Sequence, residues 1–187
     1  MSFQLAHART HNGKAGSTYE SASTSAYKHG RTETIRSTTT LSQKMCDVFL
    51  DPDSPRADKD AALRAAADNH NKITRDALMG KGWDRHMFAL RTMAETKGED
   101  LPSVFTCDAY QKLNNIILST STLASPALEA GGFGPVNKDC YAIPYSLTKE
   151  QARFGVMSYK LGTQEFADAI VASIQDFKDV LEGNDES

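Results

Sequence analysis

The chain has 187 residues, of which 40% are hydrophobic and 24% are charged, a composition typical of a folded globular protein. A formal net charge of -3 at pH 7 argues against the broad basic surface with which nucleic-acid-binding proteins hold their ligand. No apolar run approaches the roughly 18 residues that cross a bilayer. These numbers favour one globular domain with a core of its own.

The N-terminal third predicts a helix and then a strand. Residues 3–11 are expected to end a helix that Asn12 and Gly13 close. Ser and Thr dominate the stretch 17–36, where β-branched and aromatic side chains predict a strand broken at Gly30. A plain linker would not need the arginines that interrupt these hydroxyls, so the composition raises the question of what the stretch binds.

Apolar residues at helical spacing predict three further helices, over residues 41–51, 55–79 and 84–96. Ser54 is expected to cap the second of them, with Pro55 in its first turn. Glycines close the second and the third helix. The third helix is expected to bury four apolar side chains: Met87, Phe88, Leu90 and Met93.

The second half of the chain changes in character. A short helix is predicted over residues 108–114, and strands over 116–122, 140–147 and 152–161. A loop rich in glycine and proline is expected at 124–135, and a tight turn joins the last two strands.

The chain ends in a predicted helix that Thr163 caps and Gly183 closes. Its apolar stripe consists of Phe166, Ile170, Ile174, Phe177 and Leu181. Together, these helices and about five strands predict an α/β fold, with a mixed sheet flanked by helices.

Cysteine and histidine spacing predicts no metal site. Cys46, Cys107 and Cys140 lie far apart and form no CxxC pair, which is typical of buried free thiols in a reducing compartment. The five histidines show no HExxH spacing, and no general base can be identified among them from the pattern alone.

The residue pattern leaves the role of Arg85 open. In one interpretation, Asp84 caps a helix and Arg85 is a solvated charge. In the other, the Arg85 guanidinium lies at the base of a pocket and binds an anion, because arginine recognises carboxylates in a fixed fork. The pattern by itself favours the first interpretation.

Hydroxyl side chains also end the predicted strand at residues 119–122, just before the glycine loop. They either bond neighbouring backbone groups or donate to a developing oxyanion. Phe133, which lies between two glycines, either anchors a turn or forms one wall of a site for an organic cation. From the residues alone, we expect the chain to form a polar pocket for a small anionic or zwitterionic ligand.

Four segments carry a resemblance to a known family: TYESASTSAYKHGRTETIRS, GWDRHMFALR, ILSTSTLASPA and GGFGPV. In order and spacing they resemble the carnitine/choline acyltransferase family, from about Ser2 to Gly183. The resemblance implies a lobe of the CoA-dependent acyltransferase fold. It also implies carnitine O-acyltransferase activity, the reversible transfer of long-chain, palmitoyl-like acyl groups between coenzyme A and carnitine.

The resemblance implies that the hydroxyl-rich stretch holds the carboxylate of carnitine. Tyr19, Ser21 and Thr32 fall on positions that contact this carboxylate. Arg85 falls on the arginine that balances its charge. In this reading, the second interpretation of Arg85 is the one to expect.

The resemblance assigns the remaining site residues to the C-terminal half. Ser121 is expected to stabilise the oxyanion, and Ser119 belongs to the carnitine-binding residues. Phe133 falls on the aromatic residue near the trimethylammonium group, which suits a cation against a ring face. Gly131 is expected to leave room for an acyl tunnel, where the acetyl-transferring member of the family has methionine.

One motif of the family is missing. The catalytic histidine of the family lies in an HxxxD motif in the other half of the fold, and no histidine of this chain has Asp at that spacing. We therefore expect residues 1–187 to be the C-terminal part of the domain, which supplies the carnitine-binding half of the site. By itself the chain is expected to be inactive. The alternative is a non-catalytic carnitine-binding or interaction module.

The expected partners are carnitine, long-chain acyl-CoA and an N-terminal lobe that carries the histidine. Coenzyme A enters as the thioester substrate, so no cofactor and no metal are expected, and no nucleic acid. The resemblance implies the matrix side of the mitochondrial inner membrane, with membrane association only through regions outside this chain.

Overall fold

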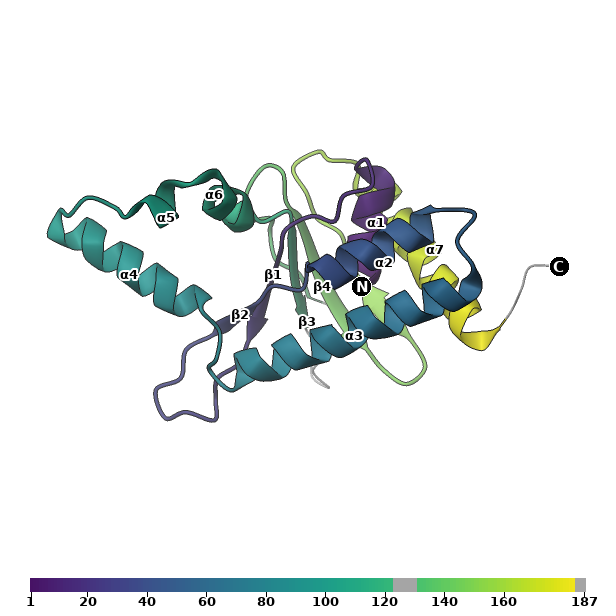
Figure 1. The fold of residues 1–187 in the computed structure, drawn as a ribbon, viewed down its shortest axis with the longest axis horizontal. Helices are drawn as coiled ribbons and strands as arrows, with labels where there is room; N and C mark the ends of the chain where they lie inside the picture. Colours follow the sequence, from purple (N-terminus) through teal and green to yellow (C-terminus); the bar gives the residue numbers. More distant parts are fainter. Residues whose placement is uncertain (123–130, 184–187) are drawn as a thin grey trace.

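The computed structural model describes residues 1–122 and 131–183, which form an α/β fold with helices flanking a mixed five-stranded sheet (Figure 1). The expected fold class is confirmed. The elements are α1 (Ser2–Thr10), β1 (Thr18–Ala22), β2 (Glu33–Ile35), α2 (Thr40–Leu50), α3 (Arg56–Leu78), α4 (Asp84–Lys97), α5 (Ser103–Thr106), α6 (Asp108–Asn114), β3 (Leu118–Thr122), β4 (Tyr141–Leu147), β5 (Ala152–Phe154) and α7 (Thr163–Glu182).

The sheet has the strand order β2-β1-β3-β4-β5. Its three central strands are parallel, and the two edge strands pair antiparallel to their neighbours. Tyr19 on β1 lies opposite Ser119 on β3, and Ser119 lies opposite Ala142 on β4. An isolated bridge from Ala142 to Met157 extends this row. The row therefore runs across the sheet and brings Tyr19 beside Ser119, which lies 100 positions later in the sequence.

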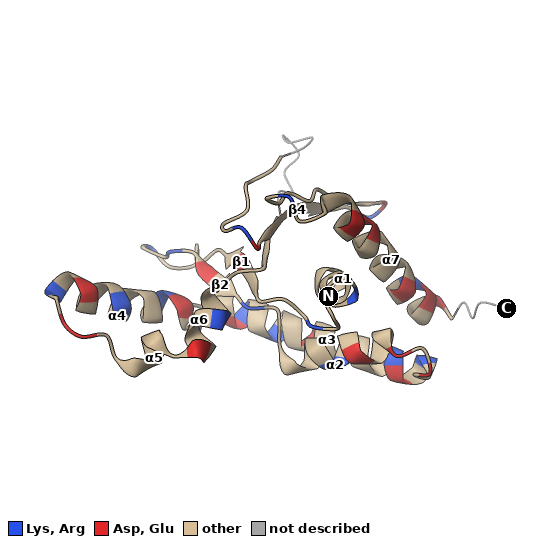
Figure 2. Ribbon diagram, turned by 90° about the horizontal axis from the view of Figure 1, so that it is seen from above, with Lys and Arg blue, Asp and Glu red and all other residues tan. Residues whose placement is uncertain are grey.

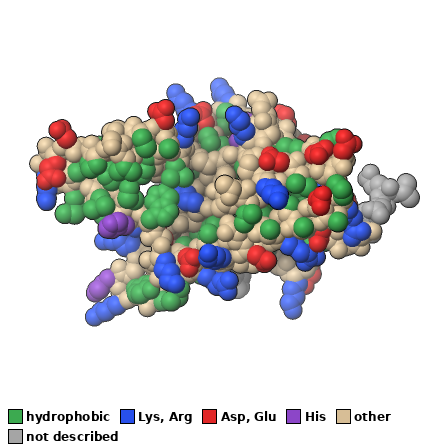
Figure 3. Space-filling model, in the orientation of Figure 1, with side chains coloured by type: hydrophobic (Ala, Val, Ile, Leu, Met, Phe, Trp, Pro, Cys, Tyr) green, Lys and Arg blue, Asp and Glu red, His purple; other side chains and the backbone are tan. Residues whose placement is uncertain are grey.

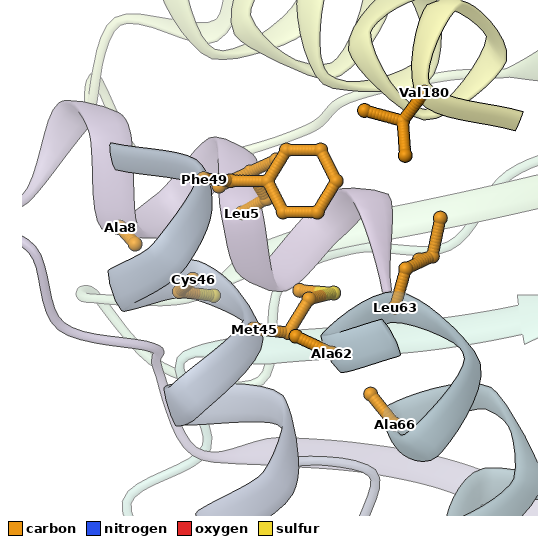
Figure 4. Packing of buried hydrophobic residues seen from close by; sticks show 9 residues of the cluster. All are labelled: Leu5, Ala8, Met45, Cys46, Phe49, Ala62, Leu63, Ala66 and Val180. Atoms are coloured by element: carbon orange, nitrogen blue, oxygen red, sulfur yellow. The ribbon is translucent and has the colours of Figure 1, made fainter. Parts of the chain in front are cut away.

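Helices α1, α2, α3 and α7 cover one face of the sheet (Figure 2). Where α1, α2, α3 and α7 meet, they bury the cluster drawn in Figure 4: Leu5, Ala8, Met45, Cys46, Phe49, Ala62, Leu63, Ala66 and Val180. A second cluster joins α1 and α7 to the sheet: Ala6, Leu118, Tyr141, Ile143, Phe166 and Ile170. Because side chains alternate along a strand, the residues between these point to the other face.

Helix α4 extends from the β2 edge of the sheet and forms an arm with α5 and α6 (Figure 1). The expected burial of its apolar side chains is wrong, because no residue of this fully described helix is buried. Phe88 is 60% exposed, Leu90 45% and Met93 54%. Helical spacing reports that a segment has an apolar face, but it carries no information on whether another element covers that face.

Two predicted caps are wrong. Ser54 Oγ bonds Asp51 Oδ2 at 2.9 Å, and α3 begins only at Arg56, after Pro55. Helix α7 begins at Thr163 itself, and the N-cap position belongs to Gly162 with φ +77°. The stripe on this last helix is also narrower than expected, since Ile174 and Leu181 are exposed: their exposed fractions are 37% and 49%.

The predicted strands are shorter in the structure. The stretch 17–36 forms two antiparallel strands separated by residues 23–32, a longer break than Gly30 alone. Strand β5 ends at Phe154, although Gly155 N–H still donates to the Pro144 carbonyl at 3.0 Å and Met157 forms an isolated bridge with Ala142. The loop expected at 124–135 lies outside the described residues as far as position 130.

The three free thiols differ in environment. Cys46 and Cys140 are buried, as predicted, but Cys107 is exposed, so the prediction is wrong for that residue. None of the helices within the described residues is long and apolar enough to span a membrane.

Candidate functional site

The candidate site lies on the face of the sheet opposite the helix layer, beside α4. Strand β1 presents Tyr19 and Ser21 to this face, because the two residues are separated by one position and side chains alternate. Glu20 between them points to the helix side, where it borders a different cavity.

The connection from β1 to β2 is closed by hydrogen bonds between its own residues. The hydroxyl of Thr24 donates to the carbonyl of Arg31, and Tyr27 N–H donates to the Thr24 carbonyl at 3.0 Å. Gly30 passes so close that a Cβ at this position would lie 2.1 Å from the Thr24 carbonyl oxygen. Only glycine fits there without moving the backbone. This closure brings Arg31 and Thr32 to the same side as Tyr19.

The start of α4 is held against the sheet by an ion pair. Arg36 Nη2 donates to Asp84 Oδ1 at 2.6 Å, and both side chains are mostly buried. Arg36 Nη1 also donates to the carbonyl of Leu113 at 2.9 Å, which ties α6 to the same point. Asp84 is therefore bound to Arg36 and does not neutralise its neighbour Arg85. The role of Asp84 as a helix cap is wrong, since Trp83 occupies that position.

Arg85 faces the β1–β2 connection. Its Nε donates to the Thr32 carbonyl at 2.6 Å, across 53 positions of sequence. Gly82 allows this approach, because a Cβ there would lie 2.3 Å from Cγ of the buried Glu33. The guanidinium of Arg85 is thus fixed at the edge of a cavity rather than free in solvent.

Strand β1, the connection and α4 line an open cavity of about 870 Å³. Its wall along α4 follows one face of the helix over its whole length. The residues around it are Tyr19, Ser21, Arg31, Thr32, Arg85, Phe88, Ala89, Thr92, Met93, Thr96 and Lys97.

The charges around the cavity have one sign. Arg31, Arg85 and Lys97 contribute positive charge, and no carboxylate lines the cavity among the residues that the structure describes. Hydroxyl donors lie beside the cations, and Phe88 and Met93 add apolar surface. Such a wall suits an anionic group attached to an apolar body.

The structure brings together four of the eight predicted site residues. Tyr19, Ser21, Thr32 and Arg85 all line the cavity, although they come from three separate segments. Their contact with a carboxylate stays a prediction, but the arrangement has the donors and the charge that it requires.

The other four predicted residues lie outside the cavity wall. Ser119 is buried in the strand next to Tyr19, and Ser121 is half-buried two positions further along β3. Phe133 is half-buried and Gly131 is exposed. Their roles stay predictions.

The segment around Phe133 nevertheless lies close to Met157, a residue that one row of the sheet connects to Tyr19 in the cavity wall. A Cβ built on Gly132 would lie 2.7 Å from Cε of Met157, so the segment around Phe133 passes over that methionine. Met157 ends the row that runs through Ala142 and Ser119 to Tyr19. Tyr19 and Ser119 therefore share one row of the sheet with Met157, and Gly132, next to Phe133 in the chain, approaches that methionine.

Two cavity cations were missed by sequence reasoning. Arg31 directly precedes Thr32, and Lys97 lies on the α4 face that begins at Arg85. The helical spacing of Arg85, Ala89, Thr92, Thr96 and Lys97 was the available signal for α4.

Comparison with known proteins identifies the family. Residues 1–176 match the family model described as Choline/Carnitine o-acyltransferase. The chain belongs to this family. The segments that carried the resemblance in sequence thus belong to a member of this family, and the mixed five-stranded sheet with its helices is consistent with an acyltransferase lobe.

The chain is similar to several curated members of the family. It is 39% identical to mitochondrial carnitine O-palmitoyltransferase 2 of Mus musculus over 186 residues, which cover 98% of this chain and 28% of the relative. The corresponding protein of Xenopus tropicalis is 38% identical, with 97% and 28% covered. A putative mitochondrial carnitine O-acetyltransferase of Saccharomyces cerevisiae is 34% identical, with 92% and 25% covered. The chain therefore spans between a quarter and a third of the length of these relatives.

Proposed function

We propose that the chain supplies the carnitine-binding part of a carnitine O-acyltransferase, which transfers long-chain acyl groups reversibly between coenzyme A and carnitine. The observation that carries this proposal is the cavity between β1 and α4, where hydroxyls and arginines converge without an acidic residue among the described lining side chains. The family membership of residues 1–176 supplies the reaction class.

The cavity suits the carboxylate end of carnitine. Within the described residues, Arg85 is held through Nε by the Thr32 carbonyl, and its terminal nitrogens are available for a carboxylate. Tyr19 and Ser21 offer hydroxyl donors from the adjacent strand. The trimethylammonium group of carnitine would lie against Phe133, which the row through Met157 connects to this face.

The chemistry is divided between this chain and a histidine elsewhere in the domain. In acyl transfer the carnitine hydroxyl loses its proton to a base, and its oxygen attacks the thioester carbonyl, which becomes a tetrahedral oxyanion. The oxyanion then collapses, the C–S bond breaks, and the sulfur of coenzyme A leaves and takes the proton from the base. We propose that Ser121 donates to this oxyanion. Since no histidine of this chain has the HxxxD spacing, we expect the 187 residues alone to bind carnitine without turnover.

The names of the relatives place them in mitochondria, and we propose the same compartment for this chain, on the matrix side of the inner membrane. Partners in this proposal are carnitine, long-chain acyl-CoA and the histidine-bearing lobe. Coenzyme A acts as a substrate in it.

The first test uses a chimera in which this chain replaces the matching segment of the Mus musculus palmitoyltransferase. Removing the charge in Arg85→Gln should cost about 1.5–3 kcal/mol of carnitine binding, roughly a 10- to 100-fold rise in its KM. The KM for palmitoyl-CoA should stay unchanged. The unaltered chimera should transfer palmitoyl groups, and the isolated chain should not.

Arg91 provides the matched control. It lies on the same helix, does not line the cavity, and pairs with Glu95 at 2.9 Å. Arg91→Gln should leave both Michaelis constants within about a factor of two, because such an exposed pair contributes only about 0.2–0.5 kcal/mol. If Arg85→Gln raised both constants equally, Arg85 would be structural and the carnitine assignment would be wrong. A chimera that binds carnitine but never turns over would favour the non-catalytic module.

The second test addresses acyl length through Gly131. Gly131→Met in the chimera should block long acyl chains by filling space beside the thioester, because a packed wall does not absorb several heavy atoms without strain. Acetyl-CoA should still react. Gly134→Met is the control, since no atom of the described residues lies within 4 Å of a Cβ at Gly134.

The measurement is a series of acyl-CoA substrates from acetyl to palmitoyl, with thermal unfolding recorded in parallel. Selective loss of the long substrates at unchanged melting temperature supports the tunnel. Uniform loss with a lowered melting temperature would mean that Gly131 serves the fold, and long-chain specificity would lose its structural basis here.

A further inference from the structure

Glu20 on β1 faces the side of the sheet opposite to that of its two neighbours. It lies between Tyr19 and Ser21, which line the α4 cavity, but its side chain points to the opposite face of the sheet. There it borders a separate cavity of about 200 Å³ together with Thr120 and Tyr145. Glu20 therefore lies directly behind the candidate carnitine residues.

The Glu20 carboxylate accepts two hydroxyl hydrogen bonds from different strands. Thr120 Oγ1 donates to Oε2 at 2.9 Å, and Tyr145 Oη donates to Oε1 at 2.5 Å. Burial and the bond to Glu20 raise the pKa of Tyr145, so the phenol remains a proton donor at neutral pH. A carboxylate with two such donors forms charge-assisted bonds, which are stronger than bonds between neutral groups.

These two bonds connect the three parallel strands at the centre of the sheet. Glu20 lies opposite Thr120 in the β1–β3 ladder, and Tyr145 lies on β4, one strand further. The ladder bonds alone join only neighbouring strands. Glu20 adds a connection that spans β1, β3 and β4 on the helix-covered side.

The same strands carry the proposed reaction residues on the other side. Ser119 and Ser121 flank Thr120 on β3, and they point to the face of Tyr19 because side chains alternate along a strand. Any shift of β1 against β3 would change the distance between Tyr19 and these serines. The tie through Glu20 opposes that shift.

We propose that Glu20 is a positioning residue for acyl transfer. Its carboxylate binds Thr120 and Tyr145 and so sets the carnitine residues of β1 in place relative to Ser119 and Ser121 of β3. This inference rests on the proposed function for its kinetic consequence, but the tie between the strands can be tested without catalysis.

The kinetic test compares Glu20→Ala and Thr120→Val in the chimera, singly and combined. Misplacement of reacting groups should lower kcat/KM for carnitine roughly 10- to 100-fold in Glu20→Ala, with the KM for palmitoyl-CoA unchanged. Thr120→Val removes one of the two bonds and should have a smaller effect. Because both changes break the same contact, the double variant should be no worse than Glu20→Ala alone. Glu20→Gln retains one acceptor oxygen and should rescue part of the loss.

Leu63→Ala separates positioning from mere loss of stability. Leu63 is buried in the α1–α2–α3–α7 cluster, away from the sheet, and its truncation should lower the melting temperature markedly. It should not change kcat/KM for carnitine below that temperature. If Leu63→Ala and Glu20→Ala altered the kinetics alike, or if Glu20→Ala left them unchanged, the positioning role would be overturned.

Amide hydrogen exchange of the 187-residue chain gives a readout that needs no activity. Glu20→Ala should speed exchange in β1 and β3, whereas Leu63→Ala should speed it first in α2 and α3. Unchanged exchange in β1 and β3 would refute the tie even if the chimera were active. An inactive chimera with the expected exchange would count against the proposed function and leave the tie established. Should Glu20→Ala not fold, Thr120→Val serves for both measurements.

Discussion

At the scale of single residues, Ser121 is the side chain with the most specific proposed chemistry. It is half-buried near the end of β3, and alternation along the strand places it on the face that carries Tyr19 and Ser21. In the chimera, Ser121→Ala should lower kcat by roughly 10²- to 10³-fold, the usual effect of removing one oxyanion donor.

Ser119→Ala is the comparison for this variant, because Ser119 lies on the same strand and face. It should lower kcat less than Ser121→Ala does, and its effect should fall mainly on the KM for carnitine. Steady-state kinetics of both variants decide the matter. A Ser121→Ala chimera that changed KM alone would show an ordinary contact in place of oxyanion stabilisation.

At the scale of elements, sequence periodicity predicted whether a segment is a helix or a strand better than it predicted which other elements pack against that segment. The long helices α2, α3, α4 and α7 and the β4–β5 hairpin were expected near their observed positions, because apolar spacing and turn residues act locally. The exposure of α4 was not predicted, since the burial of a helix depends on neighbours that are distant in sequence. The contact of Arg85 with Thr32 spans 53 positions, and no local pattern encodes it. Only the resemblance to a family placed these residues in one site.

The connection between β1 and β2 is the element that orients Arg31 and Thr32. Gly30→Ala would force a Cβ to within 2.1 Å of the Thr24 carbonyl, so the backbone of the connection must move. Overpacking of this kind costs about 1–3 kcal/mol, and we expect a lower melting temperature for the 187-residue chain. In the chimera the KM for carnitine should rise with it.

Gly134→Ala is the matched control for this prediction, because a Cβ at Gly134 meets no atom within 4 Å in the part of the chain that the structure describes. It should leave both the melting temperature and the carnitine KM as in the unaltered protein. A stable Gly30→Ala protein with normal carnitine kinetics would show that the connection tolerates rearrangement and does not orient Thr32.

At the scale of the whole molecule, the buried core that stabilises the fold and the candidate site lie on opposite faces of the sheet. The helix layer buries the core, whereas the cavity lies on the open face beside the arm of α4, α5 and α6. Hydrophobic side chains gather over that arm (Figure 3). Changes in the helix layer should therefore alter the free energy of unfolding without a direct effect on the cavity residues.

Two histidines of the helix layer should make the protein sensitive to acid. His7 is buried on α1 and donates from Nδ1 to the Lys14 carbonyl at 2.7 Å, and burial lowers its pKa below the ordinary 6.5. Burial likewise lowers the pKa of His70 on α3, whose Nδ1 has no hydrogen-bond partner within the described residues. Below pH 6.5 the unfolded chain thus binds protons that the folded chain does not, so stability falls as the pH falls.

The expected result is a free energy of unfolding that decreases between about pH 7 and about pH 5, and decreases less steeply in His7→Gln and His70→Gln. Each variant removes one group that must be buried neutral, so the slope against pH is the quantity to compare, measured by urea unfolding. Carboxylates contribute equally to all variants and cancel in this comparison. His29 is exposed, and His29→Gln should keep the slope of the unaltered chain. If all three variants kept that slope, the imidazoles of the helix layer would not be the source of acid sensitivity.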